Sequence, residues 1–137
     1  MLDLAGVGPA DVVYDLGCGD GRIVIEAVRR YGARGVCIDI DPRRIADARA
    51  NAGDLASRIE FRQEDLMRTE LAAATVVTLF LSLDLNLKLR PRLQRELRPG
   101  ARIVSHWHRM GDWRPERTVH VPGPDRDRAI FLWVIRP

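Results

Sequence analysis

The segment Val12–Ile25, VVYDLGCGDGRIVI, constrains the fold more than any other part of the chain. An apolar run ends at an acid, Asp15, and Gly17, Gly19 and Gly21 follow before a run with helical spacing begins. Glycine tolerates positive φ and lets a ligand lie against bare backbone. The pattern therefore predicts a strand, a ligand-binding loop and a helix, the opening unit of an open α/β sheet.

The spacing of the glycines narrows the class of ligand. A dinucleotide fingerprint reads G-x-G-x-x-G and directs a helix N-terminus at a pyrophosphate. Here the spacing is G-x-G-x-G, and Asp15 and Asp20 flank the loop. Two carboxylates would repel a pyrophosphate but suit a cation, which disfavours a nicotinamide dehydrogenase. The segment resembles motif I of the class I S-adenosylmethionine-dependent methyltransferases, and the resemblance implies S-adenosyl-L-methionine as the cofactor.

Strand and helix patterns alternate along most of the chain. We expect strands at 12–16, 35–40, 58–62, 75–81 and 101–106, and helices at 22–31, 42–52 and 86–97, with Pro91 in the first turn of the main part of the last helix. Two further strands, 117–121 and 129–135, are expected to form a hairpin. The predicted fold is a doubly wound, mostly parallel sheet of five βα-type strands plus a C-terminal antiparallel hairpin. It resembles the seven-strand methyltransferase sheet.

Length and composition limit the remaining possibilities. The 137 residues suffice for a single domain, 1–137, with a real core, and the net charge of +3 comes without a basic block that would indicate a nucleic-acid site. No CxxC pair or Cys/His cluster suggests a metal. Two cysteines, Cys18 and Cys37, fit free thiols in a reducing cytosol, and no apolar run reaches the roughly 20 residues of a membrane helix. We expect a cytoplasmic protein.

Acids at two further strand ends support the cofactor assignment. Asp39 lies about twenty residues after the glycine loop, where an acid accepts hydrogen bonds from ribose hydroxyls. Asp41 precedes Pro42 and is expected to cap the following helix instead. By resemblance to the family, Ile40 would cover one face of the adenine.

The third strand ends in RQEDL. In the family an acid at this point receives the adenine amino group, and Asp65 is the matching residue. Glu64 is an alternative one position away, and the backbone N–H of Leu66 is a further candidate contact to the ring. Asp65 is also consistent with an ordinary acid after a strand.

Three segments, DLGCGDGRIVI, TLFLSLDLNLKLRPRLQRELRPGARIVSH and MGDW, resemble a subfamily of small protein-lysine methyltransferases of archaea and mitochondria. The resemblance implies methyl transfer to a protein lysine by direct in-line displacement. The chain departs from the subfamily in two places. Phe80 stands where relatives usually carry tyrosine, and Trp107, His108 and Arg109 stand where they tend to carry acids that attract an ammonium group.

These departures keep two alternatives open, a small-molecule N- or O-methyltransferase and a cofactor-binding module without independent catalysis. A lysine nucleophile must be neutral, which at pH 7 costs about 4–5 kcal/mol for an ordinary pKa of about 10.4. Desolvation in an apolar pocket offsets part of this cost. Leu79, Phe80 and Leu81 are expected to line that pocket, with Leu79 among the cofactor-binding residues.

Polar candidates at the mouth of the pocket are Asp84, His106 and His108, and we name no catalytic base. Asp84 also fits a helix cap, and the histidines fit exposed loop positions. Trp107 and Trp113 would either form a wall on the substrate side or pack under their loop.

The chain starts close to its first strand. The N-terminal helix of the family is expected to be mostly missing, with MLDLAGVG as its last turn. An apolar flank near the first strand, and the strand AIFLWVI, would then need cover. We expect a homodimer that buries one of these surfaces, or a substrate that covers it.

Overall fold

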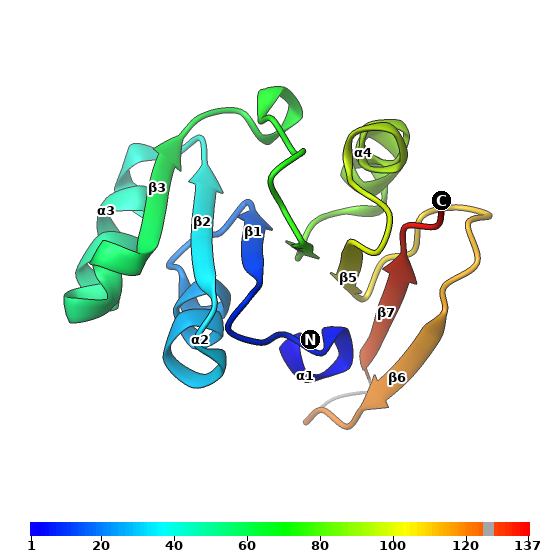
Figure 1. The fold of residues 1–137 in the computed structure, drawn as a ribbon, viewed down its shortest axis with the longest axis horizontal. Coiled ribbons are helices and arrows are strands. Elements are labelled where there is room, and N and C mark those ends of the chain that lie inside the picture. Colours follow the sequence, from blue (N-terminus) through cyan, green and yellow to red (C-terminus); the bar gives the residue numbers. More distant parts are fainter. Residues whose placement is uncertain (125–127) are drawn as a thin grey trace.

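The computed structural model describes residues 1–124 and 128–137. In these residues one seven-stranded sheet has the order β3-β2-β1-β4-β5-β7-β6 (Figure 1). The strands are β1 (Val12–Leu16), β2 (Arg34–Asp39), β3 (Ile59–Gln63), β4 (Val76–Leu79), β5 (Arg102–His106), β6 (Arg117–Val121) and β7 (Arg128–Val134). Strands β1 to β5 are parallel, and β7 runs antiparallel to both β5 and β6. The predicted fold class is confirmed.

The described residues also contain four α-helices and two short 3₁₀ helices. They are α1 (Leu2–Ala5), α2 (Arg22–Tyr31), α3 (Pro42–Ala52), α4 (Leu83–Glu96), η1 (Gly53–Arg58) and η2 (Leu66–Arg68). Helix α1 precedes the first strand, and the others lie between strands. Helix α2 has its predicted bounds because glycines in the left-handed conformation flank it, Gly21 at φ 84° and Gly32 at φ 73°. Helix α3 also has its predicted bounds. The carboxylate of Asp41 accepts the Arg43 N–H at 2.9 Å, which confirms Asp41 as a cap.

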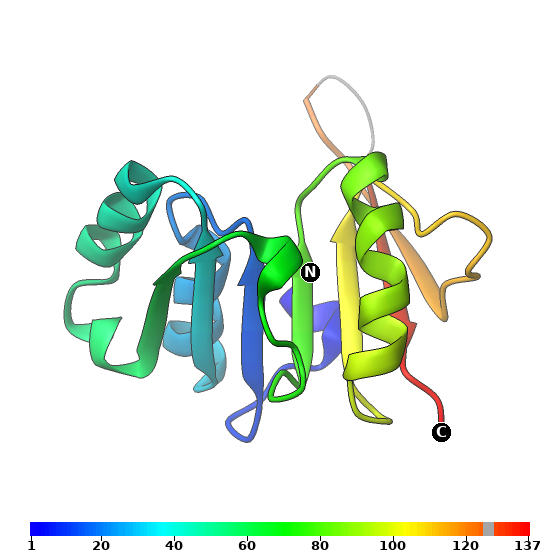
Figure 2. The same ribbon diagram turned by 90° about the horizontal axis from the view of Figure 1, so that it is seen from above.

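Helices cover both faces of the sheet (Figures 1 and 2). On one face α4 packs over a core that includes Leu16, Ile38, Leu79 and Trp133. On the other face α1, α2 and α3 cover alternate residues of the same strands, among them Val13. Strands buried on both sides carry nearly continuous apolar runs, as the sequence of β4 does.

The short helix α1 covers the flank of the sheet that we expected to be open. As predicted, the segment Met1–Gly8 contains a single turn, but that turn packs Leu2 and Ala5 onto the sheet in one cluster with Ile130 and Leu132. The opposite side of β7 joins the core under α4. Both faces of β7 are therefore covered within one chain, so neither surface requires a second copy.

The largest difference from the predicted elements is at α4. The helix begins at Leu83 rather than at 86, because the Ser82 hydroxyl accepts the Leu85 N–H at 3.2 Å and caps it. Pro91 consequently lies inside the helix and not in its first turn. Strand β4 ends at Leu79, two residues earlier than predicted, and the ends of β2, β3, β5 and β7 shift by one residue.

The parallel register brings the carboxyl ends of β1, β2, β4 and β5 to one edge of the sheet (Figure 2). The connection from β3 to β4 contains no α-helix, only the three residues of η2, as its short length predicted. Polar and glycine residues that are far apart in sequence meet at this edge. In open α/β sheets ligands bind there.

Candidate functional site

The loop between β1 and α2 is fixed against β2 by its own backbone. The N–H groups of Gly17 and Cys18 both donate to the Ile38 carbonyl, at 2.8 and 2.9 Å. Gly17 and Gly19 have φ of 75° and 58°, a region that L-residues rarely adopt. A Cβ on Gly19 would meet no atom within 4 Å, so open space adjoins this backbone.

Gly21 has a different role from the other two glycines. A Cβ there would lie 3.0 Å from the Ala48 Cβ, so the residue lets α2 and α3 pack closely. From its place near the helix start alone, Gly21→Ala would be a mild change. Its φ of 84° and this contact mean that the substitution strains the fold.

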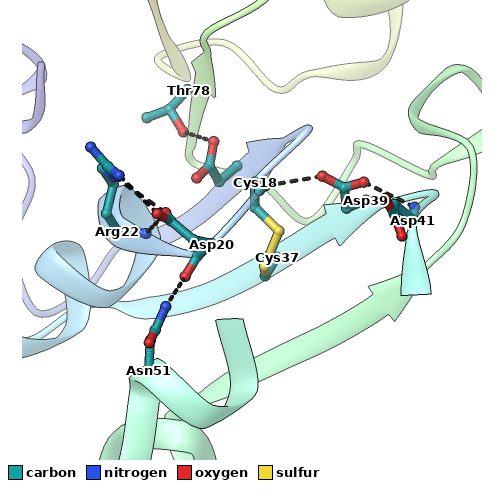
Figure 3. The surroundings of a disulfide bond; sticks show 10 residues. Cys18, Asp20, Arg22, Cys37, Asp39, Asp41, Asn51 and Thr78 are labelled. Carbon is teal, nitrogen blue, oxygen red and sulfur yellow. Dashed lines mark hydrogen bonds and ion pairs between the residues drawn. A yellow bond between two sulfur atoms is a disulfide. The ribbon is translucent and has the colours of Figure 1, made fainter. Parts of the chain in front are cut away.

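A disulfide between Cys18 and Cys37 joins the glycine loop to β2 (Figure 3). We expected free thiols, and this expectation is wrong. Both residues are buried, and their Cα atoms lie 5.3 Å apart because the loop turns back over β2. Spacing in the sequence does not reveal this proximity. Since ordinary cytosol keeps thiols reduced, the cysteines give no support to a cytoplasmic location.

Asp39 ends β2 beside the glycine loop (Figure 3). Its two carboxylate oxygens accept N–H groups from Gly19 and Asp41, each at 3.0 Å. These bonds orient the carboxylate and leave lone pairs free, as a carboxylate can accept about four hydrogen bonds. The next residue, Ile40, is 68% exposed, so its apolar side chain is available to a planar ligand.

Asp15 lies at the bottom of the same site with 2% of its surface exposed. The Thr78 hydroxyl donates to its Oδ1 at 2.9 Å. Burial raises the pKa of Asp15 to about 7; the Thr78 hydrogen bond opposes this rise, and the charges of Asp39 and Asp20 add to it. Asp20 itself pairs with Arg22 at 2.8 Å, and that pairing holds the pKa of the Asp20 carboxyl below its ordinary value.

These groups line a cavity of about 440 Å³, which we call the glycine-loop pocket. Its lining residues are Asp15, Gly17, Cys18, Gly19, Asp20, Arg22, Ile23, Asp39, Arg44 and Phe80. Four predicted site residues are in this set: Asp15, Gly17, Gly19 and Asp39. A pocket of this size suits a small-molecule ligand.

The other predicted residues do not line this pocket. Asp65 caps η2 by accepting the Met67 N–H at 2.9 Å. The Leu66 side chain approaches Gly17, with its Cδ2 3.8 Å from where a Gly17 Cβ would be. Leu79 is fully buried in the core under α4, and the residue after it, Phe80, faces the pocket instead.

A second cavity of about 370 Å³ adjoins the first, and we call it the aromatic pocket. It is lined by Phe80, Leu81, His106, Trp107, His108, Pro124 and Arg128. Phe80 is 53% exposed and lines both cavities, so a ligand in one can contact a ligand in the other across its ring. The Phe80 ring stacks on His106 with centroids 4.1 Å apart.

The titratable groups that line the aromatic pocket in the described part of the chain are His106, His108 and Arg128, and none of them is a carboxylate. Arg128 Nη1 lies 3.5 Å from His106 Nε2. Arginine can only donate, so Nε2 is the unprotonated nitrogen and is occupied. Burial, and then the charge of Arg128, lowers the pKa of His106 below its ordinary 6.5. His106 is thus neutral at pH 7 and poorly placed to act as a base.

Two candidates from the sequence lie outside the aromatic pocket. Asp84 is exposed in the first turn of α4, while Ser82 provides the cap that we considered for Asp84. Trp113 packs against Trp133 at 5.8 Å between ring centroids, under its loop rather than along a wall.

We did not predict Arg22, Ile23 and Arg44 in the glycine-loop pocket, or Arg128 in the aromatic pocket. Arg22 and Ile23 directly follow the glycine loop at the start of a predicted helix, which is a usable signal. Arg44 and Arg128 come from distant segments, and nothing in their local sequence marks them.

Comparison with known proteins identifies the family. Residues 15–117 match the ANTKMT methyltransferase domain. A protein-lysine N-methyltransferase of Saccharolobus islandicus is 37% identical over 138 residues, covering 98% of this chain and 86% of that one. The adenine nucleotide translocase lysine N-methyltransferase of Mus musculus is 33% identical over 132 residues, covering 94% of this chain, which spans only 56% of the mouse protein.

A solved structure is similar over nearly the whole chain. It is described as an RNA methyltransferase from Salinibacter ruber in complex with S-adenosyl-L-homocysteine. It is 50% identical, with a TM-score of 0.93, and the match covers 98% of this chain and 87% of that one. With the glycine loop, Asp39 and the parallel sheet in place, the chain belongs to the ANTKMT methyltransferase domain family and is an S-adenosylmethionine-dependent methyltransferase.

Proposed function

We propose that the chain transfers a methyl group from S-adenosylmethionine to the side-chain amine of a protein lysine. The observation that carries this proposal is the position of Phe80, which lines both the aromatic pocket and the glycine-loop pocket. The choice of acceptor is supported by the two relatives that are named as lysine N-methyltransferases. No helix in the described residues is long and apolar enough to cross a membrane.

The glycine-loop pocket fits the donor. The open space beside Gly19 admits a ligand against backbone, and Asp39 presents an oriented carboxylate to ribose hydroxyls. Asp15, beneath them, can offer negative charge to a cation. Ile40, Asp65 and Leu66 remain our proposed adenine contacts, on the strength of the family resemblance.

When bound, the donor supplies a methyl group on a sulfonium, an excellent leaving group, so the protein chiefly has to align the acceptor. The amine lone pair forms the new C–N bond while the C–S bond breaks, and its electron pair stays on sulfur. Phe80 and Trp107 exclude water from an amine in the aromatic pocket, which favours the neutral form. The charge of Arg128 acts in the same direction.

A different acceptor is favoured by one observation. The aromatic pocket combines Phe80 and Trp107 with Arg128, groups that stack on bases and attract phosphates, and the Salinibacter relative is described as an RNA methyltransferase. RNA is therefore the second candidate. We do not propose a homodimer, because both surfaces that suggested it are covered within the chain.

The test is transfer from a donor with an isotopically labelled methyl group, in a lysate of the source cells. Protein, RNA and small-molecule fractions are counted separately, and labelled proteins are digested and mapped by mass spectrometry. We expect label on lysine, and strongly reduced label at the same donor concentration with Asp39→Ala as the control. Label in RNA or in small molecules alone would reject the lysine acceptor. S-adenosylhomocysteine binding without any transfer would indicate a cofactor-binding module.

A further inference from the structure

The turn that follows β5 has strained backbone at the aromatic pocket. Trp107 has φ 73° and is the one non-glycine residue with positive φ among residues 1–124 and 128–137. The His108 N–H donates to the His106 carbonyl at 2.9 Å across it. This φ and this hydrogen bond correspond to the rare, strained type of γ-turn. Such strain persists only where the surrounding structure holds it, and it gathers at functional sites.

A buried amide on α4 holds this turn from behind. Asn86 is fully buried, and its Nδ2 lies 3.0 Å from Ser105 Oγ, 3.2 Å from the His108 carbonyl and 3.4 Å from the Arg109 carbonyl. Ser105 Oγ in turn donates to the His108 carbonyl at 2.7 Å. Carbonyl oxygens only accept, so the NH₂ side of the amide must face them. Asn86 and Ser105 thus bind the chain directly after the strained residue.

The asparagine at this place carries an energetic cost. Its Oδ1 is buried and has no hydrogen-bond partner in the described residues. An unsatisfied buried acceptor is destabilising, so the oxygen side of the amide adds nothing to stability. The contribution of Asn86 is therefore the bonds that its NH₂ group makes to the turn.

The turn is also tied to the rest of the site. The Trp107 N–H donates to the Ala129 carbonyl at 2.7 Å, and the His106 ring stacks on Phe80. The side chains of His106, Trp107 and His108 line the aromatic pocket. A change in the backbone at Trp107 would therefore reshape the wall opposite the glycine-loop pocket.

We propose that Asn86 and Ser105 are positioning residues for methyl transfer. They hold the strained turn at Trp107 and thereby fix the wall of the aromatic pocket against which the acceptor is aligned. This inference rests on the aromatic pocket being the acceptor site, as in the proposed function. It assigns a role to two buried side chains that contact neither cavity.

A first experiment needs no acceptor. The protein carries three tryptophans, so 5-fluorotryptophan labelling gives three ¹⁹F resonances, and Trp107→Phe assigns the one of interest. Asn86→Ala should shift or split the Trp107 resonance, leave that of Trp133 in place, and change calorimetric affinity for S-adenosylhomocysteine less than twofold. Gln94→Ala, an exposed amide on the same helix, is the control. An unchanged Trp107 resonance would overturn the proposal.

Ser105 gives a second, milder set of variants if Asn86→Ala does not fold. Ser105→Ala removes a hydroxyl that both accepts from Asn86 and donates to His108. It should perturb the Trp107 resonance, and Ser105→Thr, which keeps the hydroxyl, should restore it. Equal effects of the two Ser105 variants would attribute the change to packing and contradict the proposal.

A double-mutant cycle tests the link to strain, with poly-L-lysine as the acceptor probe. Where residue 107 is the native tryptophan, Asn86→Ala should raise the KM for the acceptor at least tenfold. In a Trp107→Gly background the same substitution should raise it less than threefold, because glycine adopts positive φ without strain. Equal effects in both backgrounds, or a parallel loss of S-adenosylhomocysteine affinity, would refute it. If wild-type protein methylates no lysine, the proposed function fails, while the fluorine experiment still decides the role of Asn86.

Discussion

Asp15→Asn should stabilise the protein at neutral and alkaline pH while weakening the donor site. The folded pKa of Asp15 is about 7, against an ordinary value of 3.8. The folded state therefore binds more protons than the unfolded state between these two values, and the free energy of unfolding falls as pH rises through that window. Above about pH 7 the buried carboxyl is ionised, and its ionisation lowers the free energy of unfolding by about 4 kcal/mol, for roughly three pKa units at 1.36 kcal/mol each.

An asparagine cannot ionise, yet its Oδ1 can still accept the hydroxyl of Thr78. The unfolding free energy of the variant minus that of wild type should therefore grow by about 2 to 3 kcal/mol from pH 5 to pH 8, and then level off. Urea titration followed by tryptophan fluorescence measures it at each pH. The contributions of the other titrating groups cancel when the two unfolding free energies are subtracted. A pH-independent cost of the substitution does not affect how their difference changes with pH.

Thr78→Val is the matched control, since it keeps the carboxyl group but removes its hydrogen-bond donor. The Thr78 hydrogen bond lowers the pKa of Asp15. In Thr78→Val the free energy of unfolding should therefore keep falling with rising pH up to a higher pH than in wild type. A pH-independent difference between Asp15→Asn and wild type would show that Asp15 has an ordinary pKa. For binding, a cationic donor favours the ionised carboxyl, so wild-type affinity should rise from pH 6 to about 7.5, and Asp15→Asn should lose that rise.

The remaining predictions concern the glycine-loop pocket. Asp39→Ala should weaken S-adenosylmethionine about ten- to a hundredfold in calorimetry, since charge-assisted hydrogen bonds contribute roughly 1.5–3 kcal/mol each; unchanged affinity would remove Asp39 from the site. Gly19→Ala should reduce donor affinity more than stability, because its Cβ enters open pocket space, whereas Gly21→Ala should mainly lower the unfolding temperature; the reverse order would contradict these roles. Reduction of the Cys18–Cys37 bond, which spans 19 positions, should cost about 3 kcal/mol of stability by urea titration, and equal stability with and without dithiothreitol would contradict this estimate.

Local signals in the sequence were enough to predict the overall fold. The bounds of α2 and α3 were predicted correctly because glycine and aspartate caps act within a few residues. The order of strands and helices, the C-terminal hairpin and four residues of the glycine-loop pocket, including Asp15 and Asp39, followed from hydrophobic period and turn chemistry.

The start of α4 shows how a local signal can mislead. Pro91 is typical of a first helical turn, and we placed it in the first turn of the main part of this helix, which we expected to begin at 86. The Ser82 cap starts the helix earlier and leaves Pro91 inside it, on an exposed position.

Tertiary structure decided the features that depend on residues far apart in the chain. The pairing of Cys18 with Cys37, the cover that α1 gives to the sheet, and the arrival of Arg128 at the aromatic pocket all require the parallel register to be formed first. The bonds from Asn86 to the turn at Trp107 are of the same kind. By itself the sequence determined the class of fold and most of the glycine loop and strand-end acids of the glycine-loop pocket, because these residues express their chemistry locally. The shape of the aromatic pocket came from contacts between segments that only the folded chain brings together.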